Sequence, residues 1–367
     1  MRLLAKNNKV LWINSISTRT PSLGSSSDIK KMGRKAKQFA QNTVRGAEKV
    51  DENLWVFTPL VLPFPHSSVA QAANKQILRA TIARLRRQLK MDDFQLWSFL
   101  PTAVNYAGSM GEDLVVYYIT DEFSQFSNID TEKVIEMERE LCKRADVVFC
   151  TANSLLESKS VYNKSSFLAS HGVDHAHFSQ ALDDSVEIAP ELRDVEGPVI
   201  GFFGLIHDWI DIKMLAEMAR RHPEWTLAIV GEWKIDVSEL QAMPNVRMLG
   251  RKPYESLPSY CRAFSVATIP FVINDLTKHV NPIKLREYLS AGLPVVSTPL
   301  PEVVFYKEHC EIADNPDDFI AATERVLKTD TAAKRKSRSK LMEAETWERK
   351  VEDLGEHVRQ AKLRKGC

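Results

Sequence analysis

Lys284 and Glu287 are two charged residues whose types and spacing fit a site for a phosphorylated sugar. They are three positions apart, so on a helix both side chains lie on one face. A lysine can bind a phosphate, and a carboxylate can accept hydrogen bonds from the vicinal hydroxyls of a sugar. The carboxylate lies roughly 7–8 Å beyond the helix start, from the ~1.5 Å rise per residue, which is about one sugar ring. The pattern favours a nucleoside diphosphate sugar; the alternative is an ordinary amphipathic helix with a solvated Lys–Glu pair.

The stretch 277–300, TKHVNPIKLREYLSAGLPVVSTPL, predicts the helix that carries this pair. Asn281 is a good N-cap, and Pro282 suits the first helical position, where its missing N–H costs nothing. Gly292 suits a left-handed cap after the last turn, and LPVVST then predicts a buried parallel strand. Free N–H groups and the helix dipole favour negative charge at the start of a helix. We therefore expect a phosphate at Asn281, Pro282 and Ile283.

The segment N-P-x-K-L-x-E-Y-L-x-x-G-x-P-V-V resembles the donor-site segment of GT-B glycosyltransferases, in the branch that acts on bacterial exopolysaccharides and teichuronic-acid-type polymers. The motif of that superfamily is usually E-x7-E. Glu287 matches the second glutamate, and the resemblance implies that it holds the ribose of the nucleotide. His279 occupies the position of the first glutamate, which is the position of contact with the transferred sugar. The resemblance also implies an α/β fold of two Rossmann-like, doubly wound domains facing a cleft.

Two carboxylates follow the predicted strand at residues 113–121, which ends in Asp121 and Glu122. Ligands of open α/β sheets bind beyond the carboxyl ends of strands, so both residues are well placed for a site. Sugar transfer needs a base for the proton of the acceptor hydroxyl, and an aspartate in a partly desolvated site suits that task. The resemblance implies an acidic base after this strand, for which we prefer Asp121 over Glu122. The alternative is that Asp121 only caps the next segment.

Glycines at the ends of predicted strands in the second half of the chain allow a ligand to approach the backbone closely. Gly204 ends the first of these strands, and Gly231 ends the second. The resemblance places the first loop beside the donor diphosphate, with His207 nearby. It places a third loop, at residues 250–254, along the nucleobase, where Arg251 or Lys252 can also meet phosphate. The dinucleotide motif G-x-G-x-x-G is not present, which counts against an NAD enzyme.

Composition narrows the class of protein. A chain of 367 residues is long enough for two α/β domains with separate cores. Its 49 basic and 48 acidic residues balance, so nothing in the charge predicts binding to nucleic acid. The five cysteines form no C-x-x-C pair, which predicts a reducing compartment with no zinc or disulfide framework. No apolar run approaches the ~20 residues of a membrane span and no signal peptide is visible, so we expect a soluble, cytoplasmic protein.

The sequence predicts four segments. They are an N-terminal acceptor-side Rossmann-like domain (1–178), an acidic linker (179–197), a C-terminal nucleotide-sugar donor domain (198–345) and a helix that crosses back toward the first domain (346–367). Only MRLLAKNN precedes the first predicted strand. We therefore expect the first domain to lack the strand with which members of the resembling group usually begin.

Residues 71–90 predict a basic helix with one apolar side. The rest of the helix surface carries Arg79, Arg84, Arg86, Arg87 and Lys90. Residues 29–43 form a second basic amphipathic segment. Such a helix can rest peripherally on the anionic inner face of the cell membrane or approach a lipid-diphosphate acceptor. The alternative is a core-facing helix with a solvated basic side.

Together these patterns predict a glycosyltransferase of cell-surface polysaccharide synthesis, which moves a sugar from a nucleotide diphosphate sugar to a saccharide or lipid-linked acceptor. No D-x-D motif occurs, so we expect no catalytic metal and no cofactor beside the donor substrate. Lys284 and the helix start would replace the metal. Two alternatives are a non-catalytic nucleotide- or saccharide-binding component of a polysaccharide-assembly complex, and a nucleotide-sugar epimerase.

Overall fold

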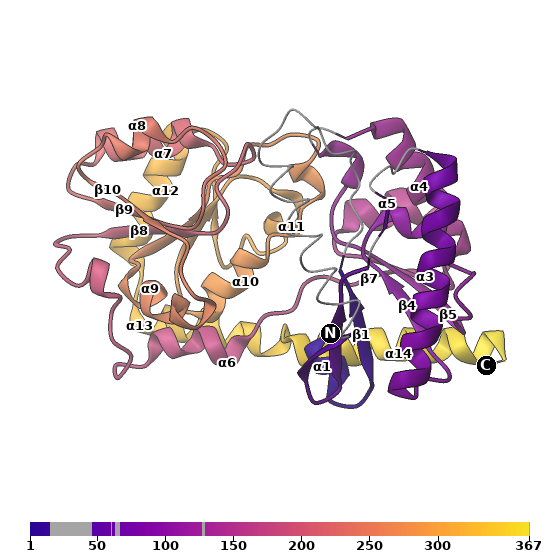
Figure 1. Cartoon of the computed structure of the whole chain (residues 1–367). Coiled ribbons are helices and arrows are strands. Elements are labelled where there is room, and N and C mark those ends of the chain that lie inside the picture. Colours follow the sequence, from indigo (N-terminus) through magenta and orange to yellow (C-terminus); the bar gives the residue numbers. More distant parts are fainter. Residues whose placement is uncertain (15–45, 60, 63–66, 127–128, 367) are drawn as a thin grey trace. The chain divides into compact units, whose positions relative to one another are not determined.

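The computed structural model describes the chain except for residues 15–45, 60, 63–66, 127–128 and 367, so the basic segment at 29–43 lies outside the described residues. The chain divides into two compact units (Figure 1). The first contains Met1–Thr151, Leu155–Ala169 and Val351–Cys367. The second contains Ala152–Ser154 and Ser170–Lys350.

The described residues of the first unit form two small sheets. Its strands are β1 (Val10–Ile13), β2 (Glu48–Asp51), β3 (Leu54–Phe57), β4 (Gln95–Ser98), β5 (Leu114–Ile119), β6 (Val147–Cys150) and β7 (Ser166–Leu168). Its helices are α1 (Arg2–Ala5), α3 (Ser68–Leu89), α4 (Thr131–Arg144) and α5 (Asn153–Ser160), the last of which begins with two residues of the second unit. The order β4-β5-β6-β7 is wholly parallel. In the order β1-β3-β2, only β2 is antiparallel.

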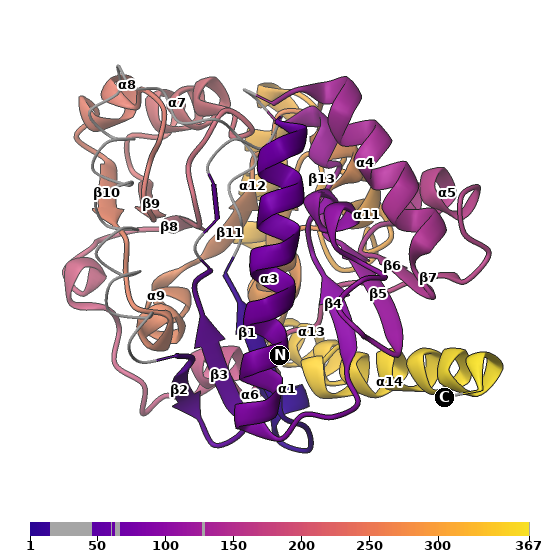
Figure 2. The ribbon, with the colours of Figure 1, turned by 45° about the vertical axis from the view of Figure 1, so that its right-hand side comes forward.

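Packing of the first unit follows from its apolar patterns. Strands β5 and β6 read LVVYYI and VVFC, and every residue of both is buried, as expected for parallel strands covered on both faces. Helix α3 lies beside β1 and β4 (Figure 2) and buries Leu78, Ile82 and Leu85, so the apolar side predicted for residues 71–90 is confirmed. None of the described helices is both long enough and apolar enough to cross a bilayer.

The second unit is built on one sheet of six parallel strands. These are β8 (Val199–Phe203), β9 (Thr226–Val230), β10 (Val246–Gly250), β11 (Val266–Ile269), β12 (Val295–Ser297) and β13 (Glu311–Ile312). Their spatial order is β10-β9-β8-β11-β12-β13, so the winding reverses between β8 and β11. Doubly wound sheets of this order bind ligands at the reversal, beyond the carboxyl ends of the strands.

Helices cover both faces of this sheet (Figure 1). They are α6 (His175–Phe178), α7 (Ile212–Arg221), α8 (Ser238–Gln241), α9 (Leu257–Ala263), α10 (Ile283–Ser290), α11 (Pro301–Val304), α12 (Pro316–Thr329) and α13 (Ala332–Leu341). Helix α7 begins at a true N-cap, since Asp211 accepts a hydrogen bond from the amide of Met214. Its apolar residues face the sheet and its two last-turn arginines complement the helix dipole.

Residues 179–197 pack on the second unit, which differs from the linker expected there. Ala181, Ala189 and Leu192 are buried, and the amide of Ala189 donates to the carbonyl of Ser259 at 3.2 Å. Single apolar residues in or next to two 3-10 turns, rather than a periodic apolar stripe, make these contacts. The segment therefore has no helical or strand pattern although three of its residues are buried.

Helix α14 (Trp347–Lys365) belongs to both units, because it begins in the second and continues in the first from Val351 onward. Leu354, Val358 and Ala361 join the apolar core that covers β5 and β6. The ring of His357 stacks on that of Phe167 at 3.8 Å between centroids.

Candidate functional site

Helix α10 starts where the chain returns from β11, at the carboxyl edge of the second sheet. Pro282 is its N-cap residue, and no side chain caps its first turn. The prediction that Asn281 caps the helix is wrong, because its side-chain oxygen accepts a hydrogen bond from Arg286 Nη1 at 2.7 Å. Gly292 follows the helix with φ +75°, as predicted.

Lys284 lies at the reversal of the sheet. Its Nζ is 5.9 Å from the ring centroid of Phe202, in β8, and 6.0 Å from that of Phe271, just after β11. Burial lowers the pKa of the Lys284 ammonium, and the nearby Glu287 carboxylate opposes that shift. The lysine therefore reaches the place where a doubly wound sheet binds its ligand, with two ring faces holding its ammonium.

Glu287 is the second charged group of this site, and its side chain is buried with 8% of the residue exposed. Burial raises its pKa to about 7, and the Lys284 ammonium opposes the shift. The carboxylate accepts no hydrogen bond and makes no ion pair within 4 Å with any residue that the structure describes. A buried acceptor in that state has lost its water without gaining a protein partner. The solvated Lys–Glu pair considered above is therefore wrong.

Three glycines line the carboxyl ends of neighbouring strands. Gly204, Gly231 and Gly250 follow or end β8, β9 and β10, with φ of +142°, +156° and +69°. The amide of Gly204 donates to the carbonyl oxygen of Val230, and the amide of Gly231 donates to the carbonyl oxygen of Gly250. A Cβ on Gly231 would lie 1.8 Å from the carbonyl oxygen of Gly204, so these turns touch directly. The predicted glycines are therefore brought together beside Lys284.

Gly204 gives the first stability prediction. A Cβ built there would lie 2.1 Å from Lys284 Cε, in a backbone conformation that L residues avoid. We expect Gly204→Ala to lower the free energy of unfolding by about 1–3 kcal/mol, measured by urea denaturation. Part of that loss should vanish in a Lys284→Ala background, because the collision is then removed. Gly250→Ala is the matched control, since nothing lies within 4 Å of its added Cβ. An equal loss in both backgrounds would contradict the contact.

Tyr254 ends the loop that the resemblance places along the nucleobase, and it contacts two residues of α6 that were not predicted as site residues. The Tyr254 ring stacks on His177 at 4.5 Å between centroids and meets Phe178 edge-on at 5.7 Å. Burial raises the pKa of the Tyr254 hydroxyl above its usual value, and the Glu287 carboxylate adds to the shift. The tyrosine is thus within electrostatic reach of Glu287. The sequence feature that could have indicated this contact is the aromatic residue Tyr254 at the end of the loop that begins at Gly250.

Four other predicted site residues lie apart from these contacts or have partners of their own. His207 is partly buried, bonds Asp208 Oδ1 at 2.6 Å and stacks on Trp209. Arg251 is exposed. Lys252 forms an ion pair with Glu191, and His279 Nδ1 lies 2.9 Å from Ser154 Oγ. Of Arg251 and Lys252, the two basic residues expected to meet phosphate, Lys252 is therefore already paired with a carboxylate. The resemblance did not indicate this pairing.

Asp121 follows β5 in the first unit, where the strand ends. Its side chain is partly buried. Burial raises the pKa of its carboxyl, and a hydrogen bond from Thr120 opposes the shift. A raised pKa makes the carboxylate a better proton acceptor, which suits a base.

Glu122, predicted as the second choice for the base, is held inside the first unit. Its carboxylate accepts from Ser124 Oγ at 2.6 Å and pairs with Lys159 Nζ at 2.8 Å. The same lysine pairs with Glu138 at 2.6 Å, and Glu138 accepts from the Tyr117 hydroxyl at 2.8 Å. Glu122 is buried, whereas Asp121 stays partly exposed. Glu122 is therefore structural, and the choice of Asp121 as base stays a prediction.

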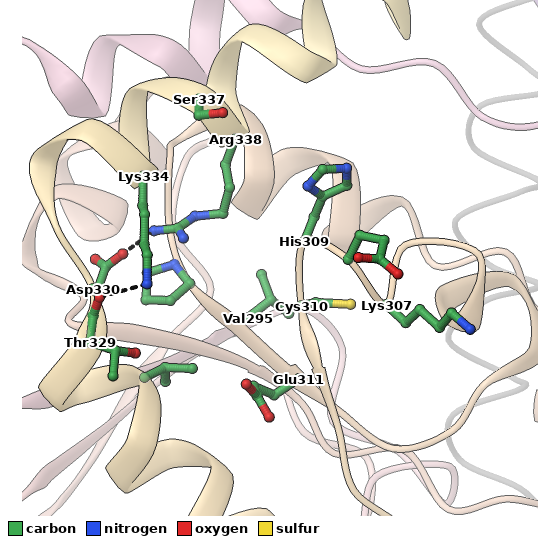
Figure 3. Close-up of a pocket in the computed structure, with 13 residues that line it drawn as sticks. Val295, Lys307, His309, Cys310, Glu311, Thr329, Asp330, Lys334, Ser337 and Arg338 are labelled. Carbon is green, nitrogen blue, oxygen red and sulfur yellow. Dashed lines mark hydrogen bonds and ion pairs between the residues drawn. The ribbon is translucent and has the colours of Figure 1, made fainter.

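A cavity of about 290 Å³ opens at the opposite edge of the second sheet, beside Val295 at the start of β12 (Figure 3). Arg338 points at Asp330, with which it forms an ion pair, and Lys334 Nζ donates to the Thr329 carbonyl at 2.9 Å. Asp330 thus neutralises Arg338, and ligands of parallel sheets bind at the carboxyl ends of the strands and not at this edge. We therefore place the candidate site at α10 and not in this cavity.

Comparison with known proteins agrees with this placement. Residues 197–329, which include the glycine turns and all of α10, match the family model for glycosyl transferases group 1. The second unit contains a group 1 glycosyltransferase domain. The resemblance read from the N-P-x-K-L-x-E-Y segment is thereby confirmed.

A relative from Bacillus subtilis (strain 168), TuaH, is named as a teichuronic acid biosynthesis glycosyltransferase and is 32% identical to this chain over 256 residues. The match covers 63% of this chain and 63% of the length of that relative.

Solved structures show the fold. The α,α-trehalose 6-phosphate synthase of Burkholderia multivorans superposes with a TM-score of 0.63 at 13% identity, covering 97% of this chain and 99% of the other. Anabaena Alr3699/HepE, solved with UDP and glucose, gives a TM-score of 0.62 at 14% identity, covering 96% and 100%. The group 1 glycosyltransferase domain thus belongs to a chain with the GT-B fold, as predicted. In the part of the chain that the structure describes, no group of three or more His, Cys, Asp or Glu residues is arranged to hold a metal ion.

Proposed function

We propose that the protein is a glycosyltransferase that uses a nucleotide diphosphate sugar as donor. The observation that carries this proposal is the buried Glu287 carboxylate, which has no hydrogen bond and lies beside Lys284 at the reversal of the sheet. Such a group is costly in the free protein and becomes favourable when a ligand donates to it. A ribose offers two adjacent hydroxyls for that purpose. The group 1 glycosyltransferase domain supports the same assignment.

In the proposed reaction the acceptor hydroxyl oxygen forms a bond to the anomeric carbon of the donor sugar. The bond from that carbon to the diphosphate oxygen breaks, and its electron pair leaves with the nucleoside diphosphate. Asp121 takes the proton of the hydroxyl. Lys284 and the uncapped first turn of α10 stabilise the negative charge that develops on the leaving group. These groups make the reaction independent of a metal, so turnover should persist in excess EDTA.

The names of similar proteins guide the choice of substrates. TuaH is named for teichuronic acid biosynthesis, and HepE was solved with UDP and glucose. We propose a UDP-sugar donor, and a saccharide or lipid-linked acceptor of cell-surface polysaccharide synthesis. No other cofactor is needed for this chemistry.

Calorimetry with UDP, GDP and ADP is the first test. We expect saturable binding of at least one of them and weak binding of the free nucleosides, because Lys284 and the α10 amides recognise the phosphates. Mass spectrometry after incubation with UDP-sugars and candidate acceptors then separates transfer from the alternatives. Sugar on an acceptor supports the proposal, and a free isomeric nucleotide sugar indicates an epimerase. Nucleotide binding without product indicates a binding component, and no binding overturns the proposal.

We also propose that α3 holds the protein peripherally on an anionic membrane, at the inner face of the cell membrane. The helix has no acidic residue in 22 positions. Arg79, Arg84 and Arg87 are exposed, and none of them forms an ion pair with another described residue. Lys133, Arg139 and Lys143 of α4, in contrast, pair with neighbouring carboxylates. Uncompensated basic charge contributes about 1 kcal/mol per residue near an anionic surface.

Sedimentation with vesicles containing phosphatidylglycerol tests this role. We expect binding that weakens with salt and is lost when Arg79, Arg84 and Arg87 are all changed to Glu. The matched control changes three α4 residues, Lys133, Arg139 and Lys143, to Glu. Equal loss in both triple variants would mean that only net charge matters and would contradict a docking face on α3.

A further inference from the structure

Asn281 stands where a helix cap is expected and does not cap. An asparagine followed by proline is typical of a capped helix start, with the asparagine oxygen accepting from the amides of the first turn. Here that oxygen accepts from Arg286 Nη1 at 2.7 Å, and the side-chain nitrogen lies 3.4 Å from Glu302 Oε2. Both polar ends of the Asn281 amide are therefore turned to other groups, and no side chain caps α10.

Arg286 is held firmly in the position that captures this oxygen. Only 4% of its surface is exposed. Its Nη2 donates to the Tyr306 hydroxyl at 3.0 Å, and its Nε lies 3.4 Å from Glu345 Oε2. Glu345 also pairs with Lys350 at 2.9 Å, in the first turn of α14. The planar guanidinium thus has a different partner for each of its three nitrogens, which fixes its orientation.

The hydrogen bond from Arg286 to Asn281 has a consequence for the ligand site at the first turn of α10. If the Asn281 oxygen were free, it could accept from the first-turn amides of α10. A phosphate that needs those amides would then have to displace the cap. Lys284 and the buried, unbonded Glu287 mark this turn as the one that faces the ligand.

We propose that Arg286 is a positioning residue that keeps the first turn of α10 open for the diphosphate of the donor by withholding the side chain of Asn281. This inference rests on the proposed function. Arg286 itself acts through Asn281 and need not touch the donor. Its role is to remove a competing acceptor from the amides, so its loss should weaken recognition of phosphate more than recognition of the nucleoside.

The test compares UDP and uridine binding by calorimetry in three variants. Glu345→Gln is the control, because Asn281 stays bonded to Arg286. Arg286→Met combined with Glu345→Gln releases Asn281 without leaving the Glu345 charge alone, and we expect UDP affinity to fall roughly tenfold, about the strength of one helix cap. Adding Asn281→Ala to that double variant should restore most of the loss. Uridine binding should change little throughout.

Restoration by Asn281→Ala separates this role from a merely electrostatic or structural one. Loss of the Arg286 charge or of packing cannot be repaired by removing a second side chain. If the double variant does not fold, Arg286→Lys is used instead, because it keeps the positive charge but loses the planar guanidinium that bonds Asn281. We then expect roughly threefold weaker UDP binding, which Asn281→Ala should again restore. Wild-type UDP affinity in the Arg286 variants, or a loss that Asn281→Ala does not repair, would overturn the inference. Because wild-type protein is measured in parallel, failure of the proposed function is seen separately, as no UDP binding at all.

Discussion

Glu287→Gln is expected to weaken UDP binding by roughly 30- to 100-fold while making the free protein more stable at alkaline pH. The affinity falls because two charge-assisted hydrogen bonds from ribose hydroxyls to the carboxylate are replaced by weaker bonds to an amide, a loss of about 1 to 1.4 kcal/mol for each bond. Calorimetry with UDP and with uridine measures this loss, and both ligands should lose affinity because both carry the ribose.

The gain in stability follows from the raised pKa of Glu287. Its pKa is about 7 in the folded protein, against 4.5 for an ordinary glutamate. The folded state therefore holds a proton that the unfolded state releases, and the resulting stabilisation is complete below pH about 4.5 and is lost as pH rises through about 7. The full loss is on the order of 3 kcal/mol. Glutamine does not titrate, so the variant should be more stable than wild type at pH 8, and the two should converge at pH 4.5.

Urea denaturation at pH 4.5, 6, 7 and 8 checks this behaviour. Glu255→Gln makes the same chemical change at an exposed residue of the same unit and should alter neither stability nor UDP affinity. Opposite changes in binding and stability are expected where a site is built at a cost to the fold. A Glu287→Gln variant that binds UDP like wild type would show that this carboxylate is not the ribose acceptor.

Asp121→Asn is expected to lower turnover at least 100-fold and to leave UDP affinity unchanged. Removing a general base costs 10²- to 10⁴-fold in rate, whereas Asp121 belongs to the first unit and the proposed nucleotide contacts to the second. Because burial raises the pKa of Asp121, wild-type turnover should rise with pH through a value above the usual 3.8. The variant should lack that rise. Steady-state kinetics across pH, together with calorimetry, measures both effects.

Two variants serve as controls for Asp121. Asp113→Asn makes the same change just before β5, at the other end of that strand, and should keep wild-type turnover. Glu122→Gln should lower the free energy of unfolding, because it weakens a buried pair with Lys159. If Asp121→Asn turns over like wild type, another group takes the proton. If Glu122→Gln is inactive but as stable as wild type, the structural assignment of Glu122 is wrong.

Much of the second unit could be predicted from local pattern. The helix around Lys284 and Glu287, its glycine stop and the buried strand after it all appear in the structure. These features depend on residues within one or two turns of each other, where capping, periodicity and turn chemistry act directly. The segment at 179–197 was harder, because its few buried residues have no period.

Partners distant in sequence decided the rest of the candidate site. Lys252 was predicted to be available for phosphate, but it pairs with Glu191, 61 residues away. Glu122 was a candidate base, but Lys159, 37 residues away, draws it into the core. Nothing near these residues in the sequence indicates such partners, since a charged side chain fits equally well a ligand site, an ion pair or a solvated surface.

The sequence by itself determined that Lys284 and Glu287 share one helix face after a strand of a doubly wound domain, because helical spacing is a local property. Only the tertiary structure decided that Asn281 turns to Arg286 instead of capping the helix, and that Glu287 is buried without a hydrogen bond. Both outcomes depend on which side chains packing brings within about 3 Å, and on how much water packing removes. Those quantities are set by the whole unit and not by any one segment.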